Sequence, residues 1–235
     1  MYRILCDSYV LYDPRLPDLF VLEPTLTQKK NEPGELTFTI PKEHPQYGMI
    51  EKLKSRIKVY RDDFLIWVGR VIEDERDLYE NRRVVAEGAL AFLLDSVLRP
   101  FTMDGMATEI WEQLLAFHNA QVNANQRLLI GSCDLPGSIS IATKDYLSAW
   151  QVLKTILLDP IGGYLIIRFD EDENPILDFF NEVPDTSTQR IEFGENLIDL
   201  VLSKSASETY TACIPLGAAF RDIDPESESD ARLTI

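Results

Sequence analysis

The stretch Arg83-Val84-Val85-Ala86-Glu87-Gly88-Ala89-Leu90-Ala91-Phe92-Leu93-Leu94-Asp95-Ser96 decides how the chain on either side of it folds. It opens with β-branched residues, which favour a strand. Gly88 breaks that pattern, and the residues after it are helix formers. Leu90, Leu93 and Leu94 have the i, i+3, i+4 spacing of one helical face. We therefore expect a strand that turns at a glycine into a short helix, a shape suited to closing the end of a small barrel.

Residues before this stretch have the composition of short strands joined by turns. In residues 36–40 apolar and polar side chains alternate strictly, which places Leu36, Phe38 and Ile40 on one face. Gly69 lies inside an apolar run and indicates a bulge or a sharp bend. Several short strands with little helix indicate a small antiparallel barrel or sandwich. The other strands expected here are residues 2–5, 9–12, 56–60 and 64–72.

Residues after about 102 have α+β character. Residues 107–121 are periodic as an amphipathic helix, with Phe117 on its apolar face and Thr108 placed to cap it. A second helix is expected at residues 145–158, ended by Pro160. Its inward positions are Leu147, Trp150, Leu153, Ile156 and Leu157, and the strands of this region are 127–131, 138–142, 164–169 and 176–180.

Strand composition returns late in the chain, at residues 191–198 and 209–217. Before these, residues 184–188 have the polar composition of a linker. Residues 222–230 are too acidic and too poor in apolar side chains for a core. The last residues, Arg232 to Ile235, have the pattern of a strand that has just begun, so we expect this chain to be part of a longer one.

Composition and charge limit the function. The chain has 235 residues and 45% apolar residues, enough for one large or two smaller cores, and two is expected. No apolar run approaches the roughly 18 residues that span a bilayer, and the start lacks the pattern of a signal peptide. We expect a soluble chain made in a cytoplasm. The net charge of −16 argues against binding to nucleic acid or anionic membranes. This negative charge either keeps the chain soluble or forms a surface that repels DNA.

The side chains that could carry chemistry are few and scattered. His44 is expected on the surface of a loop, and His118, near a helix C-terminus, is expected to be structural, with proton chemistry as the alternative. Cys6, Cys133 and Cys213 are expected to be buried free thiols. No Gly-x-Ser-x-Gly, His-Glu-x-x-His or Cys–His pattern is present. We therefore expect no catalytic residue, metal site or cofactor, and the sequence assigns no binding residue.

One acidic turn has some features of a calcium loop. Asp170, Asp172 and Asn174 match its first ligands. However, Pro175 stands at the glycine position, and Asn181 stands where a bidentate glutamate is needed. An exposed acidic turn is the preferred interpretation.

Several motifs in order resemble the N-terminal hub region of siphophage and prophage tail-tip proteins, known as phage minor structural or prophage endopeptidase tail proteins. They begin with Gly34 to Pro41, His44-Pro45 and Gly69-Arg70-Val71, and they end with Phe193 to Leu197 and Ile214 to Ala218. Between these lie Glu87 to Ser96, His118 to Val122 and Gly131. Together they span about residues 34–218.

The resemblance implies the fold of the baseplate hub of contractile-tailed phages. This is an α+β, mainly β, architecture: a small antiparallel β-barrel domain interrupted by an inserted α+β domain. Composition places the barrel at residues 1–98 and 190–235 and the insertion at residues 99–189. In the family the hub is a homotrimer beneath the tail tube, each subunit with two barrel-like domains. This chain contains only the first of these two domains, so a monomer is an alternative to the trimer for this chain.

The function implied is a structural, non-enzymatic component of a virion tail. It would join the tail tube and distal tail proteins to the tip and let phage DNA pass without specific binding. It would be assembled in the cytoplasm of the bacterial host and would not bind a membrane. Two alternatives remain open: a cell-wall hydrolase or endopeptidase, and a module that binds a host receptor or carbohydrate.

Overall fold

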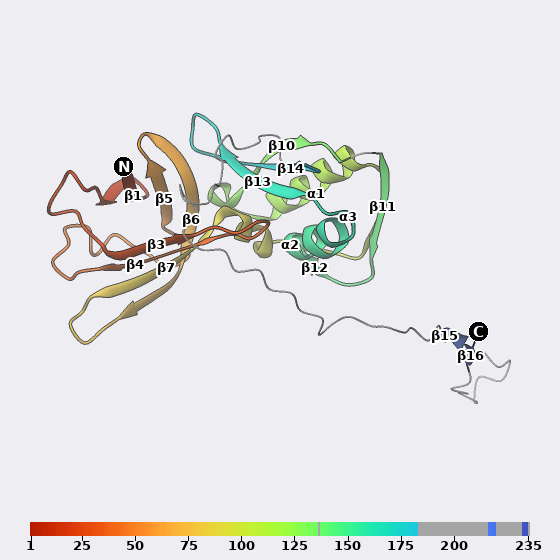
Figure 1. Cartoon of the computed structure of the whole chain (residues 1–235), viewed down its shortest axis with the longest axis horizontal. Coiled ribbons are helices and arrows are strands. Elements are labelled where there is room, and N and C mark those ends of the chain that lie inside the picture. The colour runs from red at the N-terminus through yellow and green to blue at the C-terminus, as the bar shows by residue number, and fades with distance from the viewer. Residues whose placement is uncertain (136, 183–215, 220–231, 235) are drawn as a thin grey trace, which may run out of the picture. The chain divides into compact units, whose positions relative to one another are not determined.

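The computed structural model describes residues 1–135, 137–182, 216–219 and 232–234. The chain forms two units, residues 1–186 and 187–235, which we describe separately. Within the first unit we call strands β1–β7 the curled sheet and residues 89–182 the α+β part. Figure 1 shows the curled sheet in red to yellow and the α+β part in yellow-green to cyan.

The curled sheet has seven antiparallel strands in the order β2-β1-β5-β6-β7-β4-β3 (Figure 1). Tight turns join β1 to β2 and β5 to β6, and the turn residues Asp7 and Asp62 adopt positive φ angles of 53° and 56°. The predicted first hairpin is confirmed, because Cys6 pairs with Tyr9. The strands are β1 Tyr2–Cys6, β2 Tyr9–Tyr12, β3 Leu22–Thr27, β4 Glu35–Ile40, β5 Arg56–Arg61, β6 Phe64–Arg76 and β7 Arg82–Gly88.

The apolar side chains of the sheet gather on its concave face and form the first core. Leu36, Phe38 and Ile40 are buried there, as the alternation in β4 predicts. Val59, Trp67 and Val71 from the central strands join them, together with Ile4, Cys6, Leu11, Val21, Ile50, Ile57, Val84 and Ala86. The outer strands β2 and β3 do not pair with each other, so the curled sheet stays open as a half-barrel.

Gly69 has a different role from the predicted bulge or bend. The register shifts of β6 fall elsewhere, opposite Val59–Tyr60 of β5 and at Val71–Glu73 against β7. A Cβ atom at Gly69 would lie 2.2 Å from the carbonyl oxygen of Glu87 and 2.3 Å from the Trp67 ring. The glycine is needed because the indole and the neighbouring strand approach the backbone too closely for any side chain.

The strand β7 turns at Gly88 into a 3-10 helix, η1 Ala89–Asp95, as expected. The expected helical face is only partly right. Leu90 and Leu93 are buried, but Leu94 is 46% exposed. With three residues per turn, positions i and i+3 stay on one face, whereas position i+4 turns away.

The α+β part begins with a helix between short strands. Helix α1, Ala107–Gln121, buries Ile110, Trp111 and Leu114 as predicted, but Phe117 is 49% exposed. Thr108 does not cap this helix, since its N-cap residue is Met106, which makes no side-chain cap. The neighbouring elements are β8 Val97–Leu98, β9 Phe101–Met106, the 3-10 turn η2 Ala124–Gln126, β10 Leu129–Cys133 and β11 Ser138–Thr143.

The second helix starts later than its periodicity predicts. Ser148 is its N-cap: its hydroxyl accepts a hydrogen bond from Gln151 N at 3.1 Å, and Ser148 N donates to Gln151 Oε1 at 2.9 Å. The helix continues past the expected end and stops at Gly162, which has a φ of 86°. Its segments are α2 Ala149–Gln151, the π-helical η3 Val152–Leu158 and α3 Asp159–Ile161, and Leu147 lies in strand β12, Leu147–Ser148.

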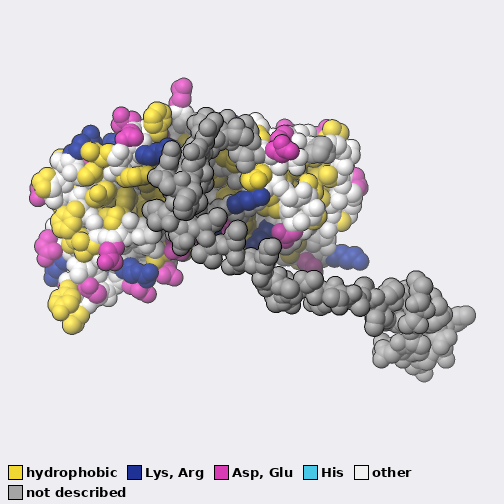
Figure 2. Space-filling model, in the orientation of Figure 1, with side chains coloured by type: hydrophobic (Ala, Val, Ile, Leu, Met, Phe, Trp, Pro, Cys, Tyr) yellow, Lys and Arg dark blue, Asp and Glu magenta, His cyan; other side chains and the backbone are white. Residues whose placement is uncertain are grey.

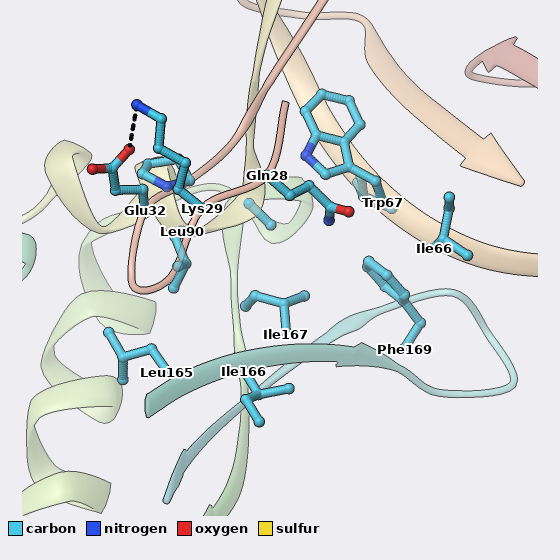
Figure 3. A pocket seen from close by; sticks show the side chains of 13 residues that line it. Gln28, Lys29, Glu32, Ile66, Trp67, Leu90, Leu165, Ile166, Ile167 and Phe169 are labelled. Carbon is cyan, nitrogen blue, oxygen red and sulfur yellow. Dashed lines mark ion pairs between the residues drawn. The ribbon is translucent and has the colours of Figure 1, made fainter. Parts of the chain in front are cut away.

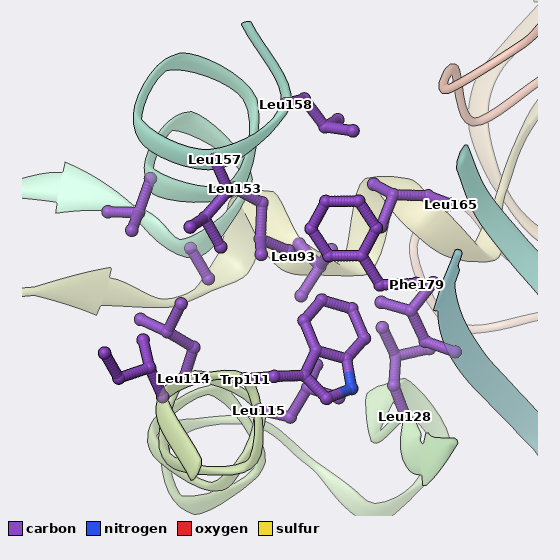
Figure 4. Packing of buried hydrophobic residues seen from close by; sticks show 14 of the residues in the cluster. Leu93, Trp111, Leu114, Leu115, Leu128, Leu153, Leu157, Leu158, Leu165 and Phe179 are labelled. Carbon is purple, nitrogen blue, oxygen red and sulfur yellow. The ribbon is translucent and has the colours of Figure 1, made fainter. Parts of the chain in front are cut away.

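Two strands complete the α+β part and close the second core. β13 Tyr164–Phe169 and β14 Pro175–Phe180 form the predicted hairpin, and β10 joins β14 in parallel. The rings of Trp111 and Phe179 meet at the centre, with centroids 5.5 Å apart (Figure 4). Leucines from η1, from α1 and from the second helix surround them, including Leu93, Leu114, Leu115, Leu153 and Leu157. The side chains of η1 thus pack into this core rather than into that of the sheet.

The second unit has one described hairpin, β15 Leu216–Ala219 with β16 Arg232–Thr234. The predicted strand at 191–198, most of that at 209–217, and Cys213 lie outside the described residues. Among the helices that the structure describes, none is long and apolar enough to cross a membrane.

Candidate functional site

The carboxylate of Glu173 joins the curled sheet to the α+β part. It lies in the β13–β14 turn and faces β5, whose alternate residues Arg56, Lys58 and Tyr60 point to the same side. Lys58 Nζ is 2.5 Å from Glu173 Oε2, and the Tyr60 hydroxyl donates to Oε1. Arg56 Nη2 donates to the Glu173 backbone oxygen at 2.7 Å. Four residues therefore form one polar junction between the two parts.

The charges of this junction shift the pKa values of its members. Burial acts to raise the pKa of the Glu173 carboxyl, but the hydrogen bonds from Lys58 and Tyr60 outweigh it and leave the pKa below its ordinary value. Burial, together with the Glu173 hydrogen bond, raises the pKa of the Tyr60 phenol. Glu173 is therefore ionised and Tyr60 is a neutral donor at physiological pH.

The turn that carries Glu173 is held by the residues that resemble calcium ligands. Asp170 Oδ1 accepts from Asn174 N at 2.7 Å, and Oδ2 accepts from Asn174 Nδ2 at 3.1 Å. Glu173 itself adopts a positive φ of 63°. No group of three or more potential metal ligands occurs among the residues that the structure describes. The expectation of a merely exposed acidic turn was incomplete, because Glu173 is half-buried against β5.

A second junction lies on the loop between β3 and β4. Asn31 donates from Nδ2 to Gly163 O at 3.0 Å and accepts from Leu165 N at 2.8 Å. One amide side chain thus satisfies a donor and an acceptor at the start of β13. Beside it, the Lys30 ammonium lies 3.8 Å from the centre of the Tyr164 ring.

A cavity of about 210 Å³ lies between these junctions. Figure 3 shows Trp67 and Ile66 of β6 on one side, Ile167 and Phe169 of β13 opposite, and Gln28 between them. The Trp67 Nε1 atom is buried and has no hydrogen-bond partner among the described residues. The residues that line the cavity come from both the curled sheet and the α+β part, so the cavity is a gap in the packing between these two parts.

A Ser–His pair is the arrangement closest to catalytic machinery among the described residues. Ser96 Oγ and His118 Nδ1 are 2.8 Å apart, and His118 Nε2 lies 3.2 Å from the backbone oxygen of Gln126. Both side chains are fully buried. Burial lowers the pKa of His118, so the ring is neutral, with Nε2 donating to Gln126 O and Nδ1 accepting from Ser96. The pair fastens the end of η1 to the end of α1, which agrees with the structural role expected for His118.

The other residues singled out from the sequence also belong to the packing of the fold. His44 is buried, which contradicts the expected surface position. Its Nε2 lies 2.8 Å from Leu11 O, and its Nδ1 accepts from Gln46 N at 3.0 Å. Loop backbone groups in the interior need such partners, and the ring supplies two. Cys6 is a buried free thiol, and burial raises its pKa to about 11. Cys133 is a free thiol that is only partly buried.

Sequence comparison gives no relatives: no protein-family profile and no curated protein match this chain. Solved structures do match. A tail protein from Neisseria meningitidis MC58 superposes with a TM-score of 0.50 and 11% identity over 75% of this chain and 50% of that one. The prophage tail protein gp18 from Listeria monocytogenes gives 0.49 and 11%, over 75% of this chain and 50% of that one. The 43 kDa tail protein of prophage MuSo2 from Shewanella oneidensis gives 0.47 and 10%, over 75% and 52%.

The likeness to the Neisseria meningitidis protein concerns the fold. The chain spans about half the length of the matched proteins, and at this identity the similarity shows the fold alone. The chain shares the fold of the Neisseria meningitidis tail protein. Its strands and helices confirm the expected α+β, mainly β, architecture with a barrel-like sheet.

Proposed function

We propose that this chain is a structural component of a phage or prophage tail tip, an adaptor in the hub between the tail tube and the tip. The observation that carries the proposal is the fold, which is shared with the Neisseria meningitidis tail protein over 75% of the chain. The two polar junctions at Glu173 and Asn31 support it, because they hold the sheet and the α+β part in one orientation, as an adaptor under load requires.

The partners that follow are other tail proteins, namely the distal tail and tail tube proteins. Its place is the virion tail, after assembly in the cytoplasm of the bacterial host. The full-length protein would be a homotrimer, while this chain by itself could be monomeric.

Immunogold electron microscopy tests the proposal. An antibody against the purified chain is applied to tailed particles induced from the source bacterium. We expect gold at the tail end distal to the capsid, and an antibody against the major capsid protein serves as the position control. Gold on the capsid, or particles that carry none, would contradict the tail-tip assignment.

We propose further that the chain acts without catalysis. The support is that the Ser96–His118 pair of the described residues has no exposed atom through which a substrate could reach it. The purified chain should release no peptidoglycan fragments above buffer. Dose-dependent release by the wild type that Ser96→Ala abolishes would instead favour the hydrolase alternative.

The finer proposal is that the hub lets DNA pass without binding it. The net charge of −16 supports this, because an acidic lining repels DNA within a Debye length of roughly 8–10 Å. On the face shown in Figure 2, acidic side chains are scattered among basic and apolar ones. A lining surface would therefore lie on another face. Fluorescence anisotropy with a labelled duplex at low salt should show no binding, and salt-sensitive binding would refute this part.

We also propose the discontinuous domain that composition predicts, with residues 190–235 joined to residues 1–98 and residues 99–189 inserted. The outer strands β2 and β3 support it, since each has a free edge among the described residues. A groove of about 630 Å³ runs inside the sheet between them and is lined by Ile4, Tyr12, Leu26 and Val59. A chain ending at residue 189 should lose solubility and stability, whereas unchanged unfolding would argue against the division.

A further inference from the structure

The tip of the β6–β7 hairpin carries two large apolar side chains in solvent. Leu78 is 92% exposed and Tyr79 is 77% exposed. Figure 2 shows an apolar projection at the end of this hairpin, at the lower left. Hairpin tips are usually built from small and polar residues, and exposed apolar groups of this size gain nothing for the fold of their own chain.

The tip is held in one conformation by its own hydrogen bonds. Asp77 Oδ1 accepts from Tyr79 N at 2.8 Å and from Asn81 N at 2.9 Å, and Asp77 Oδ2 accepts from Asn81 Nδ2 at 2.8 Å. Glu80 forms an ion pair with Lys42, and its backbone oxygen accepts from the Tyr47 hydroxyl. An ordered tip loses little conformational entropy on binding, which favours its use as a contact.

A groove of about 460 Å³ on the α+β part has matching properties. It lies between strands β8–β9 and the end of α1. Val97 and Phe117 are each 49% exposed, because they line this groove and do not join the core. Arg99 is the only charged side chain in its wall, and it makes no ion pair within the described part of the chain. The remaining lining residues are Leu98, Pro100, Phe101, Met103 and Gln121.

We propose that the hairpin tip of one copy of this chain inserts into this groove on a second copy. The groove volume falls in the range of roughly 300–1,000 Å³ typical of binding clefts. The apolar pair Leu78 and Tyr79 matches its apolar wall, and the acidic tip with Asp77 matches Arg99. Because tip and groove are different surfaces, the contact is head-to-tail and builds a ring or a chain of copies. As a contact for building a tail hub it rests on the proposed function, but its test uses no tail particles.

The contact is expected to be weak between two isolated copies. An aromatic side chain buries roughly 150–250 Å², so the tip alone remains well below the roughly 1,200 Å² of a stable interface. Self-association should therefore depend on concentration in solution and be strengthened where closure of a ring adds further contacts.

Disulfide trapping between two variants tests the contact directly. Tyr79→Cys and Pro100→Cys are purified separately, reduced, mixed at high concentration and oxidised. We expect a disulfide-linked dimer in the mixture, well above either variant alone and above the unsubstituted chain, whose native thiols set the background. Phe64→Cys mixed with Pro100→Cys is the matched control, because Phe64 is 76% exposed at the β5–β6 tip, at the opposite end of β6. Equal trapping in both mixtures, or none, would overturn the proposal.

Sedimentation velocity over a concentration series provides the second measurement. The wild type should associate as concentration rises. The double variant Leu78→Ser, Tyr79→Ser and the single variant Arg99→Glu should stay monomeric, while Phe64→Ser should behave as the wild type. A wild type that is monomeric throughout, or a tip variant that still associates, would overturn the contact. Either result leaves the immunogold test of the tail-tip function unaffected.

Discussion

Lys58 Nζ on β5 lies 2.5 Å from Glu173 Oε2, although the two residues are 115 positions apart in the chain. The Tyr60 hydroxyl donates to the same carboxylate. Hydrogen bonds to charged groups contribute about 1.5–3 kcal/mol, so we expect Glu173→Gln to lower the free energy of unfolding by about that amount. Urea denaturation measures it. Glu171→Gln, an exposed change of the same kind in the same turn, should have almost no effect, and equal losses would contradict the junction.

The same junction predicts a dependence on pH. The pKa of Glu173 is lower in the fold than its unfolded value of about 4.3. Its contribution to stability is therefore fully present above that value and is lost as the pH falls through the folded pKa. We expect the difference in unfolding free energy between wild type and Glu173→Gln to be constant from pH 7 to about pH 5 and to shrink below pH 4. A difference that grows on acidification would contradict the lowered pKa.

Gly88 at the corner between β7 and η1 should not tolerate a side chain. A Cβ atom there would lie 1.9 Å from the Pro33 carbonyl oxygen and 2.8 Å from Trp67 Nε1. Overpacking of this kind costs about 1–3 kcal/mol or more, so Gly88→Ala should lower the denaturation midpoint clearly. Gly48→Ala is the matched control, because nothing lies within 4 Å of a Cβ atom at Gly48. Similar midpoints for the two variants would refute the close approach.

Local patterns in the sequence predicted local structure well. Alternation placed Leu36, Phe38 and Ile40 in the core because a strand buries every second residue whatever it pairs with. The glycine corner at Gly88 followed from a change of propensity at one residue. The face of η1 was wrong at Leu94, because propensity does not distinguish a 3-10 helix from an α-helix. The late start of the second helix followed from the cap formed by Ser148 and Gln151, which periodicity does not register.

The polar junctions could not be predicted, because each depends on residues far apart in sequence. His44 looks like an exposed loop residue until the fold places Leu11 O 2.8 Å from its ring. Glu173 looks like one acid among several in an exposed turn until β5 is placed beside it. One signal was present: Arg56 and Lys58 share a face of β5 with Tyr60, and two cations on one strand face need a partner. Their partner could not be identified without the tertiary fold.

His118 should make stability depend on pH near neutrality. Burial keeps its pKa below that of the unfolded chain, about 6.5, so the unfolded state binds the proton first as pH falls. Its contribution is present above pH 6.5 and is lost as the pH falls toward the folded pKa. The difference in unfolding free energy between wild type and His118→Gln should therefore shrink from pH 7.5 to pH 5.5. Ser96→Ala keeps the imidazole and should retain a pH dependence, and a difference independent of pH would show that the ring is not buried neutral.

Asp178 on β14 is a buried carboxylate whose partner Arg168 is half-exposed, with side-chain exposures of 2% and 54%. Arg168 Nε lies 2.6 Å from Asp178 Oδ2, and Ser132 N donates to Oδ1 at 2.6 Å. Removing one partner of a buried pair leaves an uncompensated charge and costs about 3–5 kcal/mol, and solvent around Arg168 should reduce this to about 2–3 kcal/mol. Arg168→Leu should lower the unfolding free energy by that amount.

The control Arg127→Leu, at an exposed arginine, should change the unfolding free energy by less than about 0.5 kcal/mol. The double variant Arg168→Leu, Asp178→Asn should recover part of the loss, because the buried charge is gone. A double variant as unstable as the sum of both single variants would show that the charge of Asp178 is not what Arg168 compensates.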